Sequence, residues 1–545
     1  MQTTFATRLK QAMLNKSLKQ VDLIRMAADK GVKLGKSQLS QYVSGKTFPR
    51  QETLDFLARE LEVSSSWLEY GTPMGITSFN SKPSGASVTS QSISPIVQVN
   101  GDSSSLENTN SSDNSNIQRR TTKQHTVLTV LQQSGPSEAP IMREFKKSTK
   151  LDNVLYDVRG PVVDEANRME DQGIHVLKLN IGNPAPFGFR APDEVVADMR
   201  DQLTDTEGYS ASRGLFSARK AIMQYDQIKH IPNVQMEDIY TGNGVSELIN
   251  LTMSALLDTG DEILIPSPDY PLWTACATLA GGTAVHYLCD EQADWYPDLD
   301  DIRAKITSNT KAIVIINPNN PTGALYSREL LEEIVEIARE HQLIILSDEI
   351  YDRLVMDGEE HISIASLAPD LFCITYNGLS KSHMVAGYRI GWMSLSGNKR
   401  MARDLMLGIN MLSNMRLCSN VPAQSIVQTA LGGHQSVKDY LVPGGRVYEQ
   451  REYVYNALKE IPGVSVVKPK AAFYTFPRLD PKRFNITDDE QFALDLLREK
   501  KVLIVHGKGF NWETPGYFRI VYLPRLQTLE DAMGKITDFL SYYRQ

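Results

Sequence analysis

Leu379-Ser-Lys381, followed closely by Gly387-Tyr-Arg-Ile-Gly391, is the most informative motif of the chain. It places Arg389 eight residues after Lys381 in a polar, glycine-containing segment. Taken by itself, a lysine in a polar loop is usually a solvated side chain. Its meaning therefore depends on the motifs that surround it in the chain.

Three further motifs occur in a fixed order around this stretch. Ser347-Asp-Glu-Ile-Tyr351 ends one apolar run, and Asn317-Pro-Asn-Asn-Pro-Thr-Gly323 ends an earlier one. Near the C-terminus, Phe518-Arg-Ile-Val521 places an arginine in a short predicted strand. The ordered set is far more specific than any one of its members.

Alternating strand and helix patterns run from about residue 142 to residue 545. Short apolar runs at 262–266, 312–316 and 343–346 are each followed by a helical stretch. Continuous apolar runs of this length are typical of parallel strands that are covered on both faces. We therefore predict an α/β domain over residues 142–545 with a mostly parallel sheet.

The bulk composition is that of a globular protein. Hydrophobic residues make up 41% and charged residues 22%. The chain has 545 residues, a length that is enough for three or more domains. It has no run of 18 apolar residues, and its first residues lack the layout of a signal peptide. The four cysteines are scattered and suit a reducing compartment. We expect a cytoplasmic protein, and no motif predicts a metal site.

Net charge and amino-acid composition distinguish the N-terminal part of the chain from the rest. Residues 1–50 carry a net charge of +8, which leaves −16 for the remainder. This asymmetry indicates a polyanionic partner for the head, although a solvated helical surface would have the same charge. Residues 71–141 are rich in Ser, Asn, Thr and Gln and have one aromatic residue, Phe79. Such a composition favours a disordered linker.

Residues 1–70 predict a small all-helical domain. Apolar spacing indicates helices over 5–15, from about 20, over 36–43, around 54–61 and over 64–70. The layout, with Ser44-Gly-Lys-Thr-Phe-Pro49 after the third helix, resembles the Cro/C1-type helix-turn-helix. The resemblance implies that residues 36–43 enter the major groove of DNA. The residues expected to contact DNA are Lys36, Ser37, Gln38, Gln41 and Lys46. A helical bundle that binds another protein is the alternative.

Two further motifs complete the pattern of the body. They are Leu179-Asn-Ile-Gly-Asn-Pro-Ala-Pro-Phe-Gly-Phe189 and Gly242-Asn-Gly-Val-Ser-Glu247. With them, residues 142–545 resemble the class I/II, fold-type-I aminotransferases, and within that class the bacterial glutamate–pyruvate (alanine) aminotransferases. The resemblance implies a large domain with a mostly parallel sheet, a small α/β domain, pyridoxal 5′-phosphate (PLP) as cofactor, and a homodimer.

The resemblance assigns the residues that face the cofactor ring. Lys381 is the Schiff-base partner of PLP, and its freed amine can carry the substrate proton. Asp348 keeps the ring nitrogen protonated, although an Asp at a strand end can also be a helix cap or a surface charge. Asn320 and Tyr351 match the donors to the phenolic oxygen, with a turn Asn and a packed Tyr as alternatives. Tyr270 matches the aromatic residue that stacks on the ring.

The cofactor phosphate needs amide donors and positive charge. Gly244, Val245 and Ser246 open a predicted helix whose free amides suit an anion, and Ser380 and Arg389 match further ligands. Tyr209 resembles a residue that the second subunit of a dimer contributes. The chain departs from the pattern at Gly378, where many relatives carry a hydroxyl residue, and Asn377 is a possible substitute.

Amino-acid substrates present an α-carboxylate, which a planar guanidinium binds through two hydrogen bonds. Arg519 matches that role, and Asn320 also matches the substrate site. Gly182 lies where relatives bring the backbone close to the substrate, although it could be a plain turn glycine. Tyr156 and Arg159 lie in a segment that covers the site in relatives, where they either touch the substrate's distal end or are structural.

These residues support three functions. The first is transamination between alanine and 2-oxoglutarate in alanine biosynthesis, with a head that binds DNA. The second is a transcriptional regulator whose aminotransferase-like body senses PLP or an amino acid. The third is another transamination, of valine or an aromatic donor. Retention of Lys381, Asp348 and Arg519 together favours a working enzyme.

Overall fold

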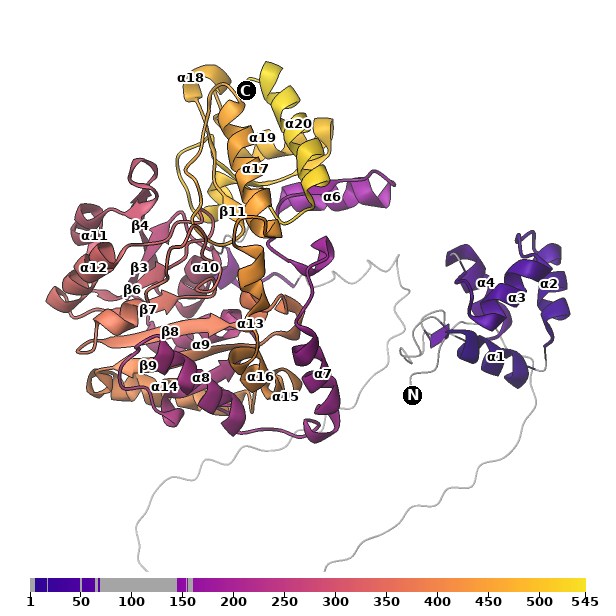
Figure 1. Ribbon diagram of the computed structural model, residues 1–545, viewed down its shortest axis with the longest axis horizontal. Coiled ribbons are helices and arrows are strands. Elements are labelled where there is room, and N and C mark those ends of the chain that lie inside the picture. The colour runs from indigo at the N-terminus through magenta and orange to yellow at the C-terminus, as the bar shows by residue number, and fades with distance from the viewer. Residues whose placement is uncertain are drawn as a thin grey trace, which may run out of the picture. The chain divides into compact units, whose positions relative to one another are not determined.

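The computed structural model describes residues 5–16, 18–49, 51–63, 67–68, 145–152, 154 and 160–545 (Figure 1). The chain divides into two compact units, residues 1–134 and 135–545, and each is described here by itself. The linker predicted over 71–141 lies outside the described residues, as does most of the helix predicted over 64–70. No helix in the described part of the chain is long and apolar enough to cross a membrane.

Four helices of the N-terminal unit lie where the apolar spacing predicts them. They are α1 (Phe5–Asn15), α2 (Gln20–Asp29), α3 (Lys36–Ser44) and α4 (Gln51–Glu60). The helix α3 ends at Gly45, whose φ of 75° is a left-handed conformation that glycine adopts without strain. The helices bury a common core that includes Leu9, Leu23, Leu39 and Leu57. The small unit thus has an apolar core of its own.

An eight-stranded sheet forms the centre of the second unit, with the strand order β2-β9-β8-β7-β6-β3-β4-β5. The strands are β2 (Ile239–Gly242), β3 (Glu262–Ser267), β4 (Thr283–Asp290), β5 (Tyr296–Pro297), β6 (Thr310–Ile316), β7 (Ile344–Asp348), β8 (Phe372–Gly378) and β9 (Gly391–Gly397). From β8 through β7, β6 and β3 to β4, each neighbouring pair is parallel, whereas β9 runs antiparallel to β2 and β8. The predicted mostly parallel sheet is therefore confirmed.

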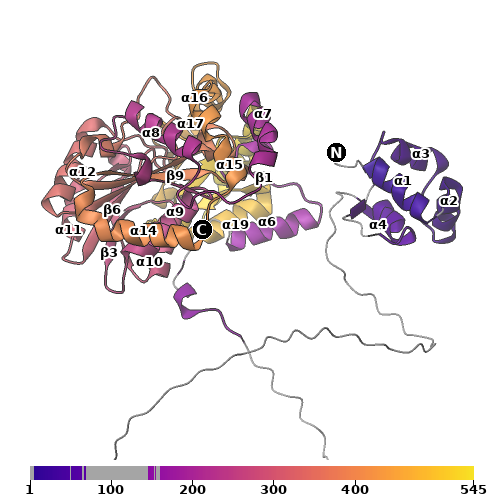
Figure 2. The same cartoon turned by 90° about the horizontal axis from the view of Figure 1, so that it is seen from below.

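Helices cover both faces of this sheet, as the continuous apolar strands require. On one face α9 (Val245–Leu256), α10 (Leu272–Ala280) and α14 (Arg403–Met415) pack on the strands. The other face is covered by α8 (Phe216–Ile228), α12 (Arg328–Glu340) and α16 (Val427–Gly432), and Figure 2 shows α9 and α14 opposite α8 and α16. The remaining helices of this part are α7 (Asp193–Asp201), α11 (Leu299–Lys305), α13 (Leu379–Ser382) and α15 (Val421–Ser425).

A smaller α/β layer is built mainly from the C-terminal residues. Its antiparallel sheet has the order β11-β15-β14, and two strand pairs, β1-β13 and β10-β12, lie beside it. These strands are β1 (Leu177–Lys178), β10 (Val464–Ser465), β11 (Tyr474–Thr475), β12 (Arg478–Leu479), β13 (Val502–Leu503), β14 (Val505–His506) and β15 (Phe518–Val521). Its helices are α6 (Pro161–Asp171), α17 (Arg446–Glu460), α18 (Pro481–Phe484), α19 (Asp489–Lys500) and α20 (Leu526–Tyr542).

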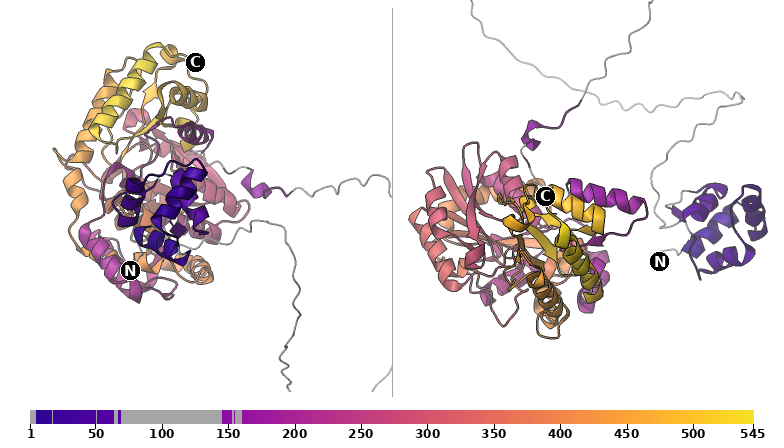
Figure 3. Two further views of the ribbon diagram at one scale, coloured as in Figure 1. Left: turned by 90° about the vertical axis from the view of Figure 1, so that its right-hand side faces the viewer. Right: turned by 90° about the horizontal axis from the view of Figure 1, so that it is seen from above.

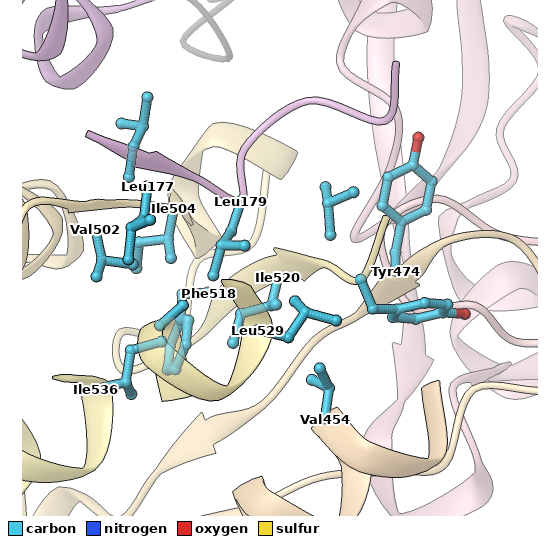
Figure 4. Close-up of a cluster of buried hydrophobic side chains, with 14 of the residues drawn as sticks. Leu177, Leu179, Val454, Tyr474, Val502, Ile504, Phe518, Ile520, Leu529 and Ile536 are labelled. Carbon is cyan, nitrogen blue, oxygen red and sulfur yellow. The ribbon is translucent and has the colours of Figure 1, made fainter. Parts of the chain in front are cut away.

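The core of the small layer joins segments that are distant in sequence. Leu177 and Leu179 pack with Phe518 and Ile520 and with residues of α20, as Figure 4 shows. Figure 3 shows α6, in magenta, beside the yellow and orange C-terminal helices, and α6 contacts α19. The segment from β1 to Gly182 is therefore fixed to the C-terminal sheet that carries Arg519.

The register of the large sheet collects the motifs at one edge. Ile316, Asp348 and Tyr376 are neighbours on the parallel strands β6, β7 and β8. Because β9 is antiparallel, its first residue, Gly391, pairs with both Gly378 and Gly242 at the same edge. The loops that leave these strand ends therefore meet in one place.

Candidate active site

A cavity of about 510 Å³ lies at this edge of the sheet and against the small layer. Side chains and backbone from both layers line it. The residues predicted from sequence that line it are Gly182, Val245, Ser246, Tyr270, Asn320, Asp348, Tyr351, Ser380, Lys381, Arg389 and Arg519. Motifs spread over more than 300 positions of the sequence thus come together around one space.

Lys381 lies on α13, directly after the buried strand β8. Its Nζ donates a hydrogen bond to the backbone oxygen of Gly182 at 2.7 Å and lies 6.0 Å from the ring of Tyr351. The amine is thus held at the cavity wall by one neutral acceptor. It can therefore serve as a nucleophile or a proton carrier there.

Asp348 ends β7 and is 4% exposed. Its carboxylate accepts hydrogen bonds from Trp273 Nε1 at 3.2 Å and from the amide of Ile350 at 3.3 Å. Burial raises the pKa of Asp348 to about 6, since no arginine or lysine of the described chain forms an ion pair with it. A protonated nitrogen facing this carboxylate would relieve the cost of burying its charge.

The first turn of α9 forms an anion cradle beside Arg389. No side chain caps this helix, so the amides of its first turn face the cavity region. Gly244 precedes it with φ of 80°, and a Cβ there would lie 2.3 Å from Arg389 Nη2. A Cβ on Gly391 would lie 2.6 Å from the amide nitrogen of Val245. Only glycines leave this approach open.

The structure explains the departure at Gly378 and removes the suggested substitute. A Cβ on Gly378 would lie 2.8 Å from the backbone oxygen of Ile390 on the neighbouring strand, so no side chain fits there. The hypothesis that Asn377 supplies a phosphate contact is wrong. Asn377 Nδ2 donates to Asp352 Oδ2 at 2.8 Å, and its side chain is not part of the cavity lining.

Arg519, on β15, is 3% exposed and carries the positive charge of the opposite cavity wall. Its Nη1 donates to Asn320 Oδ1 at 2.8 Å, and its Nη2 donates to the backbone oxygen of Asn180. The guanidinium lies between two rings, 4.5 Å from Tyr474 and 4.6 Å from Phe510. These contacts fix the orientation of the planar fork, as recognition of a carboxylate requires.

Tyr474 lines the cavity but was not predicted from the sequence. Its hydroxyl lies 2.6 Å from that of Tyr351. A Cβ on Gly182 would lie 2.1 Å from the same hydroxyl. Packing against Tyr474 therefore explains why position 182 is a glycine. Tyr474 follows Ala471-Ala-Phe473, a short apolar segment with no periodicity that could have marked it.

Two sets of predicted residues are not found in the cavity. Tyr209 is 84% exposed and does not line the cavity of its own chain. Tyr156 and Arg159 lie outside the described residues. The role suggested for Tyr209, which involves a second subunit, stays a prediction.

A buried ion network lies behind the loop that carries Asp348 and Tyr351. Lys229 Nζ pairs with Glu349 and, at 2.8 Å, with Asp352 Oδ2. Glu349 also accepts from Ser363 Oγ at 2.7 Å. The lysine supplies the cation between the two carboxylates, so the network fixes the backbone on both sides of Ile350.

In the N-terminal unit, the residues predicted to contact DNA share one exposed face. Lys36, Ser37, Gln38 and Gln41 on α3, with Lys46 after it, are exposed. Leu39 and Tyr42 of the same helix are buried. Gln38 Nε2 donates to the Tyr42 hydroxyl at 2.8 Å, which leaves its amide oxygen available on the surface.

The cavity fits PLP on its own chemistry. It combines a lysine amine, a buried carboxylate with a raised pKa, and an uncapped helix start that glycines keep open beside an arginine. These groups match an aldehyde, a ring nitrogen and a phosphate respectively. Ser246 and Ser380 add hydroxyls to the phosphate end.

Residues 174–536 match the family described as aminotransferase class I and II. The chain is 60% identical over 404 residues to the glutamate-pyruvate aminotransferase AlaA of Escherichia coli, covering 74% of this chain and 100% of that protein. It is 55% identical to the alanine aminotransferase of Mycobacterium tuberculosis, covering 74% of this chain and 94% of that protein.

Solved structures agree with these sequence relatives. An aminotransferase from Escherichia coli matches with 60% identity and a TM-score of 0.73, over 74% of this chain and 100% of that chain. Alanine aminotransferase from Pyrococcus furiosus matches with 40% identity and a TM-score of 0.70, over 73% of this chain and 100% of that chain. The chain therefore belongs to the class I and II aminotransferases, which are PLP-dependent enzymes with the fold-type-I architecture.

Proposed function

We propose that the chain transfers the amino group of L-alanine to 2-oxoglutarate, giving pyruvate and L-glutamate. The observation that carries this proposal is the convergence of Lys381, Asp348 and Arg519 on one cavity. Relatives with 55–60% identity are named glutamate-pyruvate or alanine aminotransferases, which supports alanine as the donor. The reaction would serve alanine synthesis.

The residues divide the chemistry between two walls of the cavity. Arg519 binds the α-carboxylate of either substrate, and Asn320 orients that guanidinium. When bound, the cofactor supplies an electron-withdrawing ring that accepts charge from the substrate Cα. Asp348 would hold the ring nitrogen protonated, and Arg389 and the α9 amides would hold the phosphate.

Lys381 is the residue placed to move the proton. Its Nζ lies at the cavity wall beside Gly182, and transfer requires an amine that can both accept and return a proton. Tyr351 is buried at the cavity wall, and its hydroxyl would donate to the phenolic oxygen of the bound cofactor. The small layer excludes water behind Arg519, which strengthens its interaction with a carboxylate.

Steady-state kinetics across amino donors tests the proposal. Alanine, glutamate, valine, aspartate and tyrosine are compared with 2-oxoglutarate or pyruvate as acceptor, on the full chain and on residues 142–545. We expect the highest kcat/KM for the alanine and glutamate pair, with ping-pong kinetics on both proteins. A higher kcat/KM for valine or an aromatic donor would replace the alanine assignment, and absence of turnover would favour the sensor.

We also propose that the enzyme is a homodimer in which Tyr209 reaches the partner's cavity. On α14, Leu407, Met411 and Met415 follow each other at four-residue spacing and are 65%, 63% and 74% exposed. Ser212 Oγ donates to Asn414 Oδ1 at 2.6 Å, which joins the Tyr209 segment to the end of this helix. A second copy on this face would cover the apolar stripe and bring Tyr209 to a neighbouring site.

For the N-terminal unit we propose DNA binding by α3. A specific observation favours this second function, because polar and cationic side chains occupy the whole exposed face of a short helix over a packed core. Two units per dimer would contact two half-sites, which lie about 34 Å apart in successive major grooves. Fluorescence anisotropy with genomic fragments from around the protein's own gene, at low and moderate salt, tests it. Binding no tighter than that of residues 142–545 would favour a protein partner.

A further inference from the structure

Tyr474 joins the two sides of the active-site cavity. Its hydroxyl is 2.6 Å from that of Tyr351, and its ring centroid lies 4.5 Å from the Arg519 guanidinium. Both tyrosines are buried, at 2% and 3% exposed. The residue thus contacts one group that faces the cofactor and one that faces the substrate carboxylate.

The hydrogen in this short pair can have either of two positions. If Tyr351 donates to Tyr474, the only hydroxyl hydrogen of Tyr351 is used within the protein. If Tyr474 donates to Tyr351, the hydrogen of Tyr351 remains for an acceptor in the cavity. The second arrangement is favoured because the cation nearer to a phenol makes it the stronger donor. Arg519 lies 4.5 Å from the Tyr474 ring, whereas Lys381 Nζ lies 6.0 Å from the Tyr351 ring.

We propose that Tyr474 is a positioning residue that acts through Tyr351, donating to its oxygen so that the Tyr351 hydroxyl points its hydrogen at the cofactor's phenolic oxygen. The inference rests on the proposed function. It deepens that function by adding a residue that sets how strongly the phenolic oxygen is held in its charged form. A donor that itself accepts a hydrogen bond donates more strongly.

Two further observations support this chain of hydroxyls. Burial and the neighbouring Tyr474 keep the pKa of Tyr351 well above its ordinary value, so Tyr351 stays a neutral donor. Gly182 is needed to make room, because a Cβ there would lie 2.1 Å from the Tyr474 hydroxyl. The Gly182 carbonyl in turn accepts from Lys381, so one glycine serves both sides of the site.

The test is the pH at which the visible absorption band of the lysine-bound cofactor titrates in the holoenzyme. Tyr474→Phe removes only the hydroxyl and keeps the ring under Arg519, so the protein should fold and bind cofactor. We expect the midpoint to rise by about half a pH unit, since a weaker Tyr351 donor stabilises the charged oxygen less. Adding Tyr474→Phe to Tyr351→Phe should give no further shift.

Tyr522→Phe is the matched control. Tyr522 is a buried tyrosine of the same core whose hydroxyl donates to the backbone oxygen of Ala472 at 3.1 Å, outside the cavity lining. Its midpoint should equal that of wild type. Gly182→Ala, which displaces the Tyr474 hydroxyl, should shift the midpoint upward and provides a second route if Tyr474→Phe does not fold.

The outcomes separate this inference from the proposed function. An unchanged midpoint in Tyr474→Phe would overturn the inference, as would an equal shift on the Tyr351→Phe background. In both cases the wild type would still transaminate alanine and show the titrating band. A wild type with neither property would overturn the proposed function and the inference together.

Discussion

The catalytic body and the N-terminal unit present polar residues in opposite ways. In the body, Asp348 and Arg519 are 4% and 3% exposed and converge from distant strands on one cavity. In the N-terminal unit, the polar residues of α3 are neighbours in sequence and lie on an exposed helix face. A convergent buried set defines a chemistry residue by residue, whereas an exposed face defines only the kind of surface that can dock.

The difference makes the two regions separable by mutation. Residues 174–536 match the family, and 74% of this chain covers the full length of a 60% identical relative, so catalysis should not require the N-terminal unit. Single substitutions are expected to have their largest effects on activity in the body, where each catalytic role depends on one side chain. Smaller effects are expected on α3, where several side chains share the contact.

Lys381→Ala should have the largest effect. Loss of the amine removes both the covalent partner of the cofactor and the proton carrier, so kcat should fall by more than about 10³-fold. Cofactor should remain partly bound through the Arg389 and α9 cradle, and DNA binding should not change. Steady-state kinetics and anisotropy on the same preparation check this, and wild-type turnover would refute the assignment.

Arg519→Ala should come next. A charge-assisted bidentate pair contributes about 1.5–3 kcal/mol, so kcat/KM should fall about ten- to a hundredfold or more. The loss should be similar for alanine and glutamate, because both present the same α-carboxylate. Arg519→Lys, which keeps the charge without the planar fork, is the matched control and should recover part of the loss. No effect on either donor would mean that another arginine binds the carboxylate.

Asp348→Asn should separate stability from activity within the body. The raised pKa of about 6 means that ionised Asp348 destabilises the cofactor-free fold, by on the order of 3 kcal/mol above pH 6. This cost is absent below the unfolded pKa near 4 and grows as pH rises toward 6. Cofactor-free Asp348→Asn should therefore unfold at a higher temperature than wild type at pH 7.5, and the gap should close toward pH 4.5.

Asp348→Asn should lower the turnover of the holoenzyme although it raises the melting temperature of the cofactor-free protein. With no charge to hold a protonated ring nitrogen, Asp348→Asn should lose activity at every pH. Equal melting temperatures at pH 7.5 would show that the carboxylate is not strained by burial in the cofactor-free protein.

The smallest effect is expected on α3. Lys36→Ala should weaken DNA binding a few-fold at low salt and reduce its salt dependence, since one phosphate contact is lost. Gln38→Ala should weaken binding with little change in salt dependence. Lys10→Ala on α1 is the matched control with an exposed lysine off the α3 face. Alanine turnover should stay at the wild-type value in all three, and a change in turnover would indicate coupled regions.

Local patterns predicted the helices and strands, and the resemblance to the class I/II aminotransferases predicted the residues that line the cavity. The strands that end in Ile316 and Asp348 were visible as apolar runs, and α1 to α4 as periodic ones. Tyr474 was missed because its role depends on the approach of β11 to Gly182, which no spacing encodes. Asn377 was misjudged for the same reason, since its partner Asp352 was not known from the sequence to lie behind the strand.

A single half-reaction tests whether this cavity transaminates alanine. The holoenzyme is mixed with L-alanine and no acceptor, and pyruvate and the visible absorption spectrum are measured together. We expect one pyruvate per chain and loss of the visible band of the lysine-bound cofactor, in wild type and in residues 142–545. The band should return when 2-oxoglutarate is added. No pyruvate and an unchanged spectrum, with cofactor bound, would contradict it.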